Sequence, residues 1–184
     1  MDNLLRCRAC GYIMKESNKS GLCPACGVKR ASFEPYKETV SAKRLWLLNQ
    51  HLHGITVNFP QALAALLFLA TAAGIAIQGL QENLIVVVRD IAILLPLSQA
   101  GGIFTGLIDG RTRFKRLMTP LLKTKMIVGS VALCFGIAIF VLGLDFRFSG
   151  MIPYALLALN ACSLGCQVFL AKLGASMVCT KVPG

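Results

Sequence analysis

The chain has 184 residues, of which 55% are hydrophobic, and its mean hydropathy is +0.67. Water-soluble domains rarely reach so positive a value, so this composition excludes a purely soluble protein. The net charge of +11 comes from basic clusters that separate long uncharged runs. Membrane topology accounts for such clusters, so we expect no nucleic-acid partner.

Two Cys-x2-Cys pairs open the chain, Cys7 with Cys10 and Cys23 with Cys26, separated by twelve residues. Four thiolates at this spacing favour one tetrahedral metal ion, either zinc or iron. A Gly follows each pair, which lets the chain turn tightly and direct backbone N–H groups at a sulfur. Disulfides are the alternative, but the spacing suits a metal and the expected compartment keeps thiols reduced.

Residues 4–36 resemble the rubredoxin-like domain, in the short form carried by rubrerythrins. The shared features are Cys-x2-Cys-Gly-Tyr, the twelve-residue loop, Cys-Pro-x-Cys-Gly and Phe33. The resemblance implies that all four cysteines ligate one iron that carries one electron, and that Tyr12 and Phe33 form an apolar lid. Zinc fits the same cage. Residues 1–36 are too poor in apolar side chains to fold alone, so we expect the metal to contribute most of the folding free energy.

Residues 37–53 are expected to form an amphipathic connector, with a short helix over residues 41–48. Trp46, Lys43 and Arg44 are residues that favour the membrane–water interface.

Four uncharged runs follow, at 54–81, 91–108, 126–144 and 148–171. A membrane-spanning helix needs about 20 apolar residues, and the second run reaches this length when residues 86–90 extend it. Short connections make neighbouring helices antiparallel. The predicted fold is therefore a small rubredoxin-like knuckle of short strands (1–36), the connector (37–53) and an all-α transmembrane four-helix bundle (54–181).

The loops predict the orientation. The second loop is basic: beside the single acid Asp109 it contains Arg111, Arg113, Lys115, Arg116, Lys123 and Lys125. With four spans, the N-terminus and the C-terminus lie on the same side of the membrane as this loop. They add Lys43, Arg44, Lys172 and Lys181 to that side. Because Lys and Arg accumulate on the cytoplasmic side, we expect a multi-pass protein of the bacterial inner membrane with the metal domain and the C-terminus in the cytoplasm. The N-terminus enters the Cys motif directly, so no secretory signal is expected.

A second resemblance covers residues 51–178. The opening from His51 to Leu63, and Gly106-Leu107-Ile108-Asp109, are similar to an uncharacterised family of four-span bacterial membrane proteins whose opening pattern is close to His-Pro-x-x-Val-His-Phe-Pro-x-Ala-Leu. Here Gly54 replaces the Pro and Asn58 replaces the second His. A redox role is suspected for that family, since a His at a helix entrance can ligate haem or another metal.

His51 and His53 are the only histidines. In a helix they point about 200° apart, so both cannot ligate one haem. His53 is the candidate for binding haem or quinone, and the alternative is that it hydrogen-bonds the start of the first membrane helix. Asn160, Ser163 and Gln167 share one face of the last helix and predict interhelical hydrogen bonds, with a quinone lining as the alternative.

The sequence contains no nucleophile–base pair, no phosphate-binding loop and no paired carboxylates in an apolar span. We therefore expect an electron-transfer protein or subunit rather than an independent enzyme. It would pass single electrons between a cytoplasmic redox partner and a membrane oxidoreductase, haem or quinone. The alternative is a zinc knuckle that acts as a structural membrane adaptor or accessory subunit. Small residues such as Gly101, Gly102 and Gly106 let helices approach closely, which is compatible with a homo-oligomer or a larger complex.

Overall fold

The computed structural model describes residues 4–17, 21–37, 41–114 and 119–178, with the side chains of Phe114 and of residues 176–178 excepted. Lys115, Arg116, Cys179 and Lys181 lie outside the described residues. The chain forms an N-terminal unit, built from residues up to Ala42, and a helical unit, Lys43–Leu173. Each unit is described by itself, and the predicted domain limits of 1–36, 37–53 and 54–181 stay predictions.

The N-terminal unit is a small antiparallel sheet of three strands. They are β1 (Leu4–Cys7), β2 (Ile13–Lys15) and β3 (Phe33–Tyr36), in the order β2-β1-β3, with a short 3-10 turn η1 (Arg30–Ser32) before β3. The register pairs Leu5 with Met14, and Cys7 with Phe33. Among the described residues of this unit, only Cys7, Met14 and Cys23 are buried. The predicted short strands are confirmed, and so is the lack of a sizeable apolar core.

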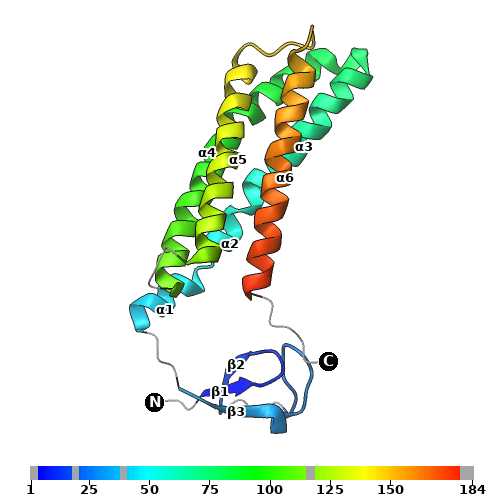
Figure 1. Cartoon of the computed structure of the whole chain (residues 1–184). Coiled ribbons are helices and arrows are strands. Elements are labelled where there is room, and N and C mark those ends of the chain that lie inside the picture. Colours follow the sequence, from blue (N-terminus) through cyan, green and yellow to red (C-terminus); the bar gives the residue numbers. More distant parts are fainter. Residues whose placement is uncertain (1–3, 18–20, 38–40, 115–118, 179–184) are drawn as a thin grey trace. The chain divides into compact units, whose positions relative to one another are not determined.

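The helical unit contains four long helices that alternate in direction (Figure 1). They are α3 (Asn58–Ala76), α4 (Gln81–Phe114), α5 (Pro120–Leu144) and α6 (Ile152–Val178), preceded by α1 (Ala42–Asn49) and α2 (Leu52–Thr56), with a short η2 (Gln78–Leu80) between α3 and α4. Four helical segments are long and apolar enough to cross a membrane. The predicted knuckle followed by four apolar helices is confirmed.

Helix α4 is longer than the uncharged run that predicted it. Its 34 residues extend about 50 Å, whereas the hydrocarbon layer is about 30 Å thick. Arg89, Asp90 and Asp109 therefore lie within the helix rather than in loops. At the start of α5, the Thr119 side chain accepts a hydrogen bond from the Leu122 N–H, with Pro120 at the first helical position.

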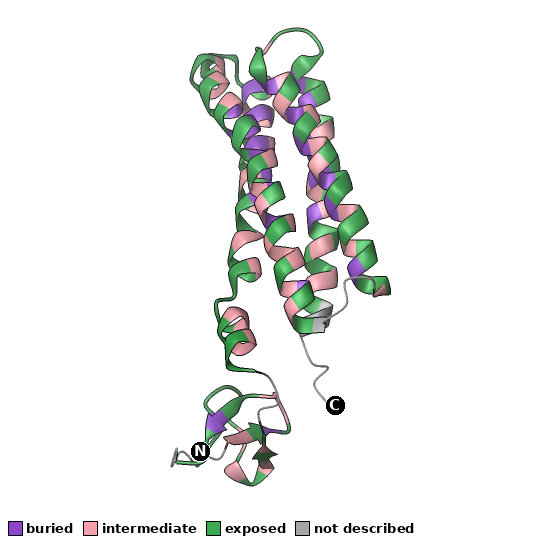
Figure 2. Ribbon diagram, turned by 90° about the vertical axis from the view of Figure 1, so that its left-hand side faces the viewer, coloured by how far each residue is buried: buried purple, intermediate pink, exposed green. Residues whose placement is uncertain are grey.

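The bundle core is made of apolar side chains and glycines at points of close approach. Ala64, Leu67, Leu95, Ile139 and Leu156 belong to one buried cluster, and buried residues line the inner faces of the helices (Figure 2). A Cβ on Gly74 would lie 2.2 Å from the Phe148 ring, and one on Gly143 would lie 2.5 Å from the Ala92 Cβ. Small residues at such contacts are typical of membrane helix packing, which has little hydrophobic driving force between helices.

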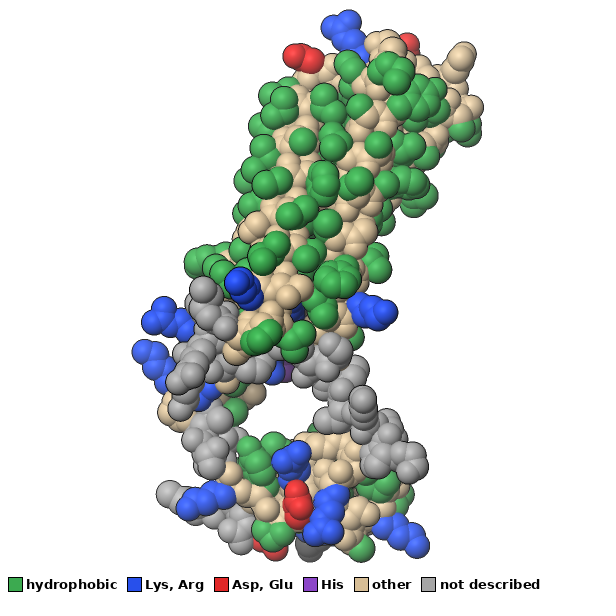
Figure 3. All heavy atoms as spheres, in the orientation of Figure 1, with side chains coloured by type: hydrophobic (Ala, Val, Ile, Leu, Met, Phe, Trp, Pro, Cys, Tyr) green, Lys and Arg blue, Asp and Glu red, His purple; other side chains and the backbone are tan. Residues whose placement is uncertain are grey.

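The outer surface of the helical unit is apolar. Leu69, Leu97 and Phe104 are 64–65% exposed, and hydrophobic side chains cover the visible face of the bundle (Figure 3). A soluble bundle would carry polar side chains at these positions. This surface is of the kind that lipid chains cover, as expected of a multi-pass membrane protein.

Candidate metal centre

The four N-terminal cysteines lie on two loops with the same backbone pattern. In the first loop the Gly11 N–H donates to the Cys7 carbonyl (2.9 Å) and the Cys7 N–H donates to the Tyr12 carbonyl (2.8 Å). The second loop repeats both bonds, from Gly27 to Cys23 (2.9 Å) and from Cys23 to Val28 (2.8 Å). Such a pattern at equal spacing is that of a pair of metal-binding knuckles.

A glycine ends each knuckle because the backbone there is left-handed. Gly11 has φ +77° and Gly27 has φ +74°. A side chain in this region is strained, whereas glycine adopts it without cost. The sequence-based reason for a Gly after each Cys pair is thereby confirmed.

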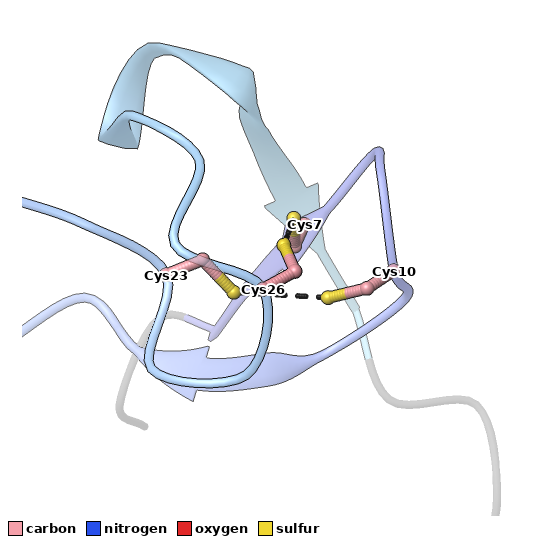
Figure 4. Close-up of side chains that lie close together, drawn as sticks. All are labelled: Cys7, Cys10, Cys23 and Cys26. Carbon is pink, nitrogen blue, oxygen red and sulfur yellow. Dashed lines mark hydrogen bonds between the residues drawn. The ribbon is translucent and has the colours of Figure 1, made fainter. Parts of the chain in front are cut away.

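The four sulfur atoms converge on one point (Figure 4). All four Sγ atoms lie within 4.8 Å of one another; Cys7 and Cys26 are 3.8 Å apart, and Cys10 and Cys23 are 3.7 Å apart. With metal–sulfur bonds of about 2.3 Å, an ideal tetrahedron puts its sulfurs about 3.8 Å apart. The four cysteines are therefore positioned to bind one metal ion, and this donor set fits iron as well as zinc.

The same distances are too long for a disulfide between Cys7 and Cys26 or between Cys10 and Cys23. A disulfide bond joins its sulfurs at about 2.05 Å, well below the observed separations. The seven cysteines among the described residues are all free.

Backbone N–H groups and neighbouring thiols set the protonation of the cage. The Tyr12 backbone hydrogen bond favours the Cys10 thiolate, but desolvation and the other three thiols outweigh it and raise the pKa of Cys10 to about 12. Desolvation acts in the same direction on Cys23, yet hydrogen bonds from the Cys26 and Ala25 backbone lower its pKa to about 7. Cys23 therefore loses its proton readily, whereas Cys10 does so with difficulty. A bound cation is needed to hold all four cysteines together as thiolates.

The cage is open on one side. Cys7 and Cys23 are buried, Cys10 is half-buried and Cys26 is exposed. Phe33 is half-buried opposite Cys7, in agreement with its expected covering role, but Tyr12 is 40% exposed. The expectation that Tyr12 and Phe33 together form an apolar lid stays a prediction.

Comparison with known families gives the N-terminal unit its class. Residues 6–34 match the family model described as the rubrerythrin, rubredoxin-like domain. The N-terminal segment is therefore a rubredoxin-like domain with a four-cysteine cluster. No curated protein and no solved structure matches the chain. The resemblance of residues 51–178 to a four-span family stays a prediction.

His53 belongs to the helical unit. It is half-buried in α2, with its Nδ1 atom 3.4 Å from the Thr105 hydroxyl of α4. His51 precedes α2 with a left-handed backbone (φ 50°) and is exposed. Asn58 is exposed as well, and its side-chain amide donates to the Gly54 carbonyl (3.2 Å). Within the described ranges, the four cysteines are the single group of three or more metal-binding side chains. A haem or quinone role for His53 stays a prediction.

Asn160 and Ser163 of α6 form the interhelical hydrogen bonds that their spacing predicts, whereas Gln167 donates to the Ser163 hydroxyl (3.2 Å) within α6 itself. The buried Asn160 amide donates to the Ala64 carbonyl of α3 (2.8 Å), and the Gln99 amide of α4 donates to the Ser163 hydroxyl (3.0 Å). The sequence did not identify Gln99 as the partner, although a lone Gln in an uncharged run is itself a signal.

Proposed function

We propose that this protein is a membrane-anchored one-electron carrier. The observation that supports it is the cluster of four thiols in a rubredoxin-like domain, on a chain with four helices able to span a membrane. Iron in this cage supplies one-electron chemistry, because it alternates between its ferric and ferrous states.

The protein's own residues would hold and tune the centre. Cys7, Cys10, Cys23 and Cys26 are the proposed ligands, and backbone hydrogen bonds at Tyr12, Ala25 and Val28 spread the negative charge of their sulfurs. The exposed side chain of Cys26 offers a redox partner a short approach to the cage.

The partner we propose on the cytoplasmic side is a protein with an acidic surface. Arg6, Lys29 and Lys37 are exposed on the N-terminal unit, while Glu34 is engaged by Arg8 in an ion pair of 3.3 Å. Charge complementarity would steer such a partner to the unit, with an effect that salt weakens. The membrane anchor would keep the carrier at high effective concentration near a membrane oxidoreductase.

The proposed location is the bacterial inner membrane, with the metal domain in the cytoplasm. One end of the helical unit carries Lys43, Arg44, Arg111, Lys123 and Lys172, and blue side chains gather there at the lower end of the bundle in Figure 3. The opposite end has both signs of charge, with Glu82, Asp90, Asp145 and Arg147. An excess of Lys and Arg favours the cytoplasmic side.

The second candidate function is a zinc-filled knuckle that acts as an adaptor or accessory subunit. The geometry that favours it is the same cage, because zinc takes four thiolates at the same distances. Zinc has no redox chemistry, so the two functions differ in one measurable property.

The deciding experiment is metal analysis and visible spectroscopy on the full chain, purified without oxygen from membranes of a host supplied with iron. The carrier predicts one iron per chain and thiolate-to-iron absorption bands that bleach with dithionite. The matched control is Cys134→Ser, since Cys134 is an exposed cysteine of α5 that does not belong to the four-cysteine cluster. A colourless protein with one zinc per chain would establish the adaptor and overturn the carrier.

A further inference from the structure

Positive charge is concentrated at one end of the helical unit, where α1, the end of α4, the start of α5 and the end of α6 carry basic side chains (Figure 3). Besides Arg113, the described cations at this end are Lys43, Arg44, Arg111, Lys123, Lys125 and Lys172. Asp109 is the one described acid beside them. This end therefore has a surplus of cations that the described side chains do not neutralise.

The single carboxylate at this end is already paired. The Arg113 Nε atom donates to both oxygens of Asp109, at 3.1 and 2.9 Å, from the next turn of α4. Arg44 of α1 is engaged as well, because its guanidinium donates to the backbone carbonyls of Thr112 and Arg113. Asp109 and these carbonyls are thus occupied by arginines, and the lysines must find their counter-charges elsewhere.

Lys125 of α5 differs from the other lysines at this end. Its side chain is half-buried, whereas Lys43, Lys123 and Lys172 are exposed. Asp109 is near enough for its charge to act on Lys125, but within the described ranges Lys125 forms neither an ion pair nor a hydrogen bond. A cation that is partly withdrawn from water is costly without a counter-charge. The position of Lys125 therefore favours a bound anion.

The depth of Lys125 in the membrane indicates where that anion comes from. Lys125 lies about one and a half turns into α5, and the uncharged run 126–144 begins directly after it. It is thus the last charge before the hydrocarbon layer, and its long side chain lets the amine reach the headgroups. Phospholipid phosphates lie at this level of a bilayer.

The neighbours of Lys125 favour a lipid over a free ion. Leu121, Met126 and Ile127 of α5 are apolar and 39–56% exposed. Acyl chains would cover these side chains, whereas inorganic phosphate has no apolar part to do so. The surplus of cations further favours a lipid with net negative charge, because the phosphate of phosphatidylcholine is already balanced by the ammonium group of the same molecule.

We propose that Lys125 binds the phosphate of an anionic phospholipid, with its ammonium group donating to a phosphate oxygen. The exposed cations at the same end, such as Lys43 and Lys123, attract anionic lipids to this side of the protein. Lys125 then holds one headgroup through a charge-assisted hydrogen bond. This binding is independent of the metal centre and of the proposed electron transfer.

The test uses the full chain carrying zinc, so that iron and redox activity play no part. The protein is stripped of lipid in a neutral detergent and titrated with phosphatidylglycerol or phosphatidylcholine, and native mass spectrometry counts the lipids bound to each chain. One phosphatidylglycerol should bind at least about tenfold more tightly than phosphatidylcholine, since a hydrogen bond to a charged group distinguishes them. Lys125→Gln should weaken phosphatidylglycerol binding at least about tenfold, whereas Lys125→Arg should retain it.

Lys43→Gln is the matched control, because it removes the same charge from an exposed position at the same end. It should weaken binding by no more than about fivefold, the contribution of one basic residue near an anionic membrane surface. Equal losses in Lys43→Gln and Lys125→Gln would overturn the proposal, since they would indicate a diffuse charge effect. Two results on the unmutated protein would overturn it as well: equal binding of both lipids, or displacement of phosphatidylglycerol by an equal concentration of inorganic phosphate.

Discussion

The Arg89 guanidinium of α4 donates two hydrogen bonds to the carbonyl oxygen of Phe146, at 3.2 and 3.0 Å. Phe146 lies in the connection between α5 and α6; its side chain is fully buried and meets the Phe148 ring edge to face at 4.9 Å. These two bonds therefore tie the connection between α5 and α6 to α4.

Replacing Arg89 by Met should lower the free energy of unfolding by about 1.5–3 kcal/mol, because a hydrogen bond from a charged donor is lost and the carbonyl is left without it. Unfolding of the protein in mixed micelles by added SDS measures the change. Arg147→Met is the matched control: Arg147 is exposed in the same connection, and its replacement should change stability by less than about 0.5 kcal/mol. Equal losses in both variants would contradict a structural role for the Arg89 bonds.

Gly136 of α5 gives a second prediction. A Cβ there would lie 2.0 Å from the Gln99 Oε1 atom and 3.1 Å from its Cδ atom, so Gly136→Ala must displace the amide that donates to Ser163. We expect a loss of about 1–3 kcal/mol from overpacking, measured by the same SDS unfolding. Gly165→Ala in α6 is the control, because no atom lies within 4 Å of its Cβ position, and alanine there should be neutral or stabilising.

A double variant tests the cause of that loss. If the clash with Gln99 is responsible, Gly136→Ala should cost at least about 1 kcal/mol less in a Gln99→Ala background than in the original protein. Additive effects would show that the alanine acts on another contact.

The sequence could predict the features that depend on local spacing. Each Cys-x2-Cys-Gly repeat forms its backbone hydrogen bonds and its left-handed glycine within a few residues. The conformation of each knuckle can therefore be predicted from its local sequence. Long uncharged runs predict the four apolar helices because a membrane admits few other structures. The ends of α4 could not be predicted in this way, since an uncharged run indicates the hydrocarbon depth rather than where the helical hydrogen bonds stop.

Features that join distant parts of the chain were beyond sequence reasoning. Arg89 contacts a carbonyl 57 residues away, and His53 contacts Thr105 at a separation of 52 residues. Each bond depends on which helices become neighbours and on their rotation, and backbone carbonyls carry no sequence signal. The sequence could single out His53 from its position at a helix entrance, but not its contact with Thr105 of α4.

Metal removal should unfold the N-terminal unit and leave the helices intact. In the described part of this unit Cys7, Met14 and Cys23 are the buried side chains, so little apolar burial remains when the metal leaves. Cys23→Ser, or a chelator, should abolish stoichiometric metal binding and the hydrogen-exchange protection of β1–β3, while the far-ultraviolet circular dichroism of the helices persists. Cys134→Ser should retain both the metal and the protection. Protected strands in a metal-free sample would show that the sheet is stable by itself.

Metal affinity should rise with pH, because the metal displaces thiol protons. Neighbouring thiols and desolvation raise the pKa of Cys10 to about 12 despite the Tyr12 hydrogen bond, so this thiol is protonated at neutral pH in the metal-free protein. Cys23, whose pKa backbone hydrogen bonds lower to about 7 against desolvation, loses its proton near neutrality. Lowering the pH therefore adds protons that the metal must displace. For each proton released on binding, the metal affinity falls about tenfold for every unit by which the pH is lowered.

Competition with a chelator of known pH dependence, between pH 6.5 and 8, measures how steeply the metal affinity changes with pH. Above pH 7 the contribution of Cys23 should fade while that of Cys10 persists, so the slope should decrease but stay positive. An affinity that does not change over this range would mean that the thiols are already ionised without metal.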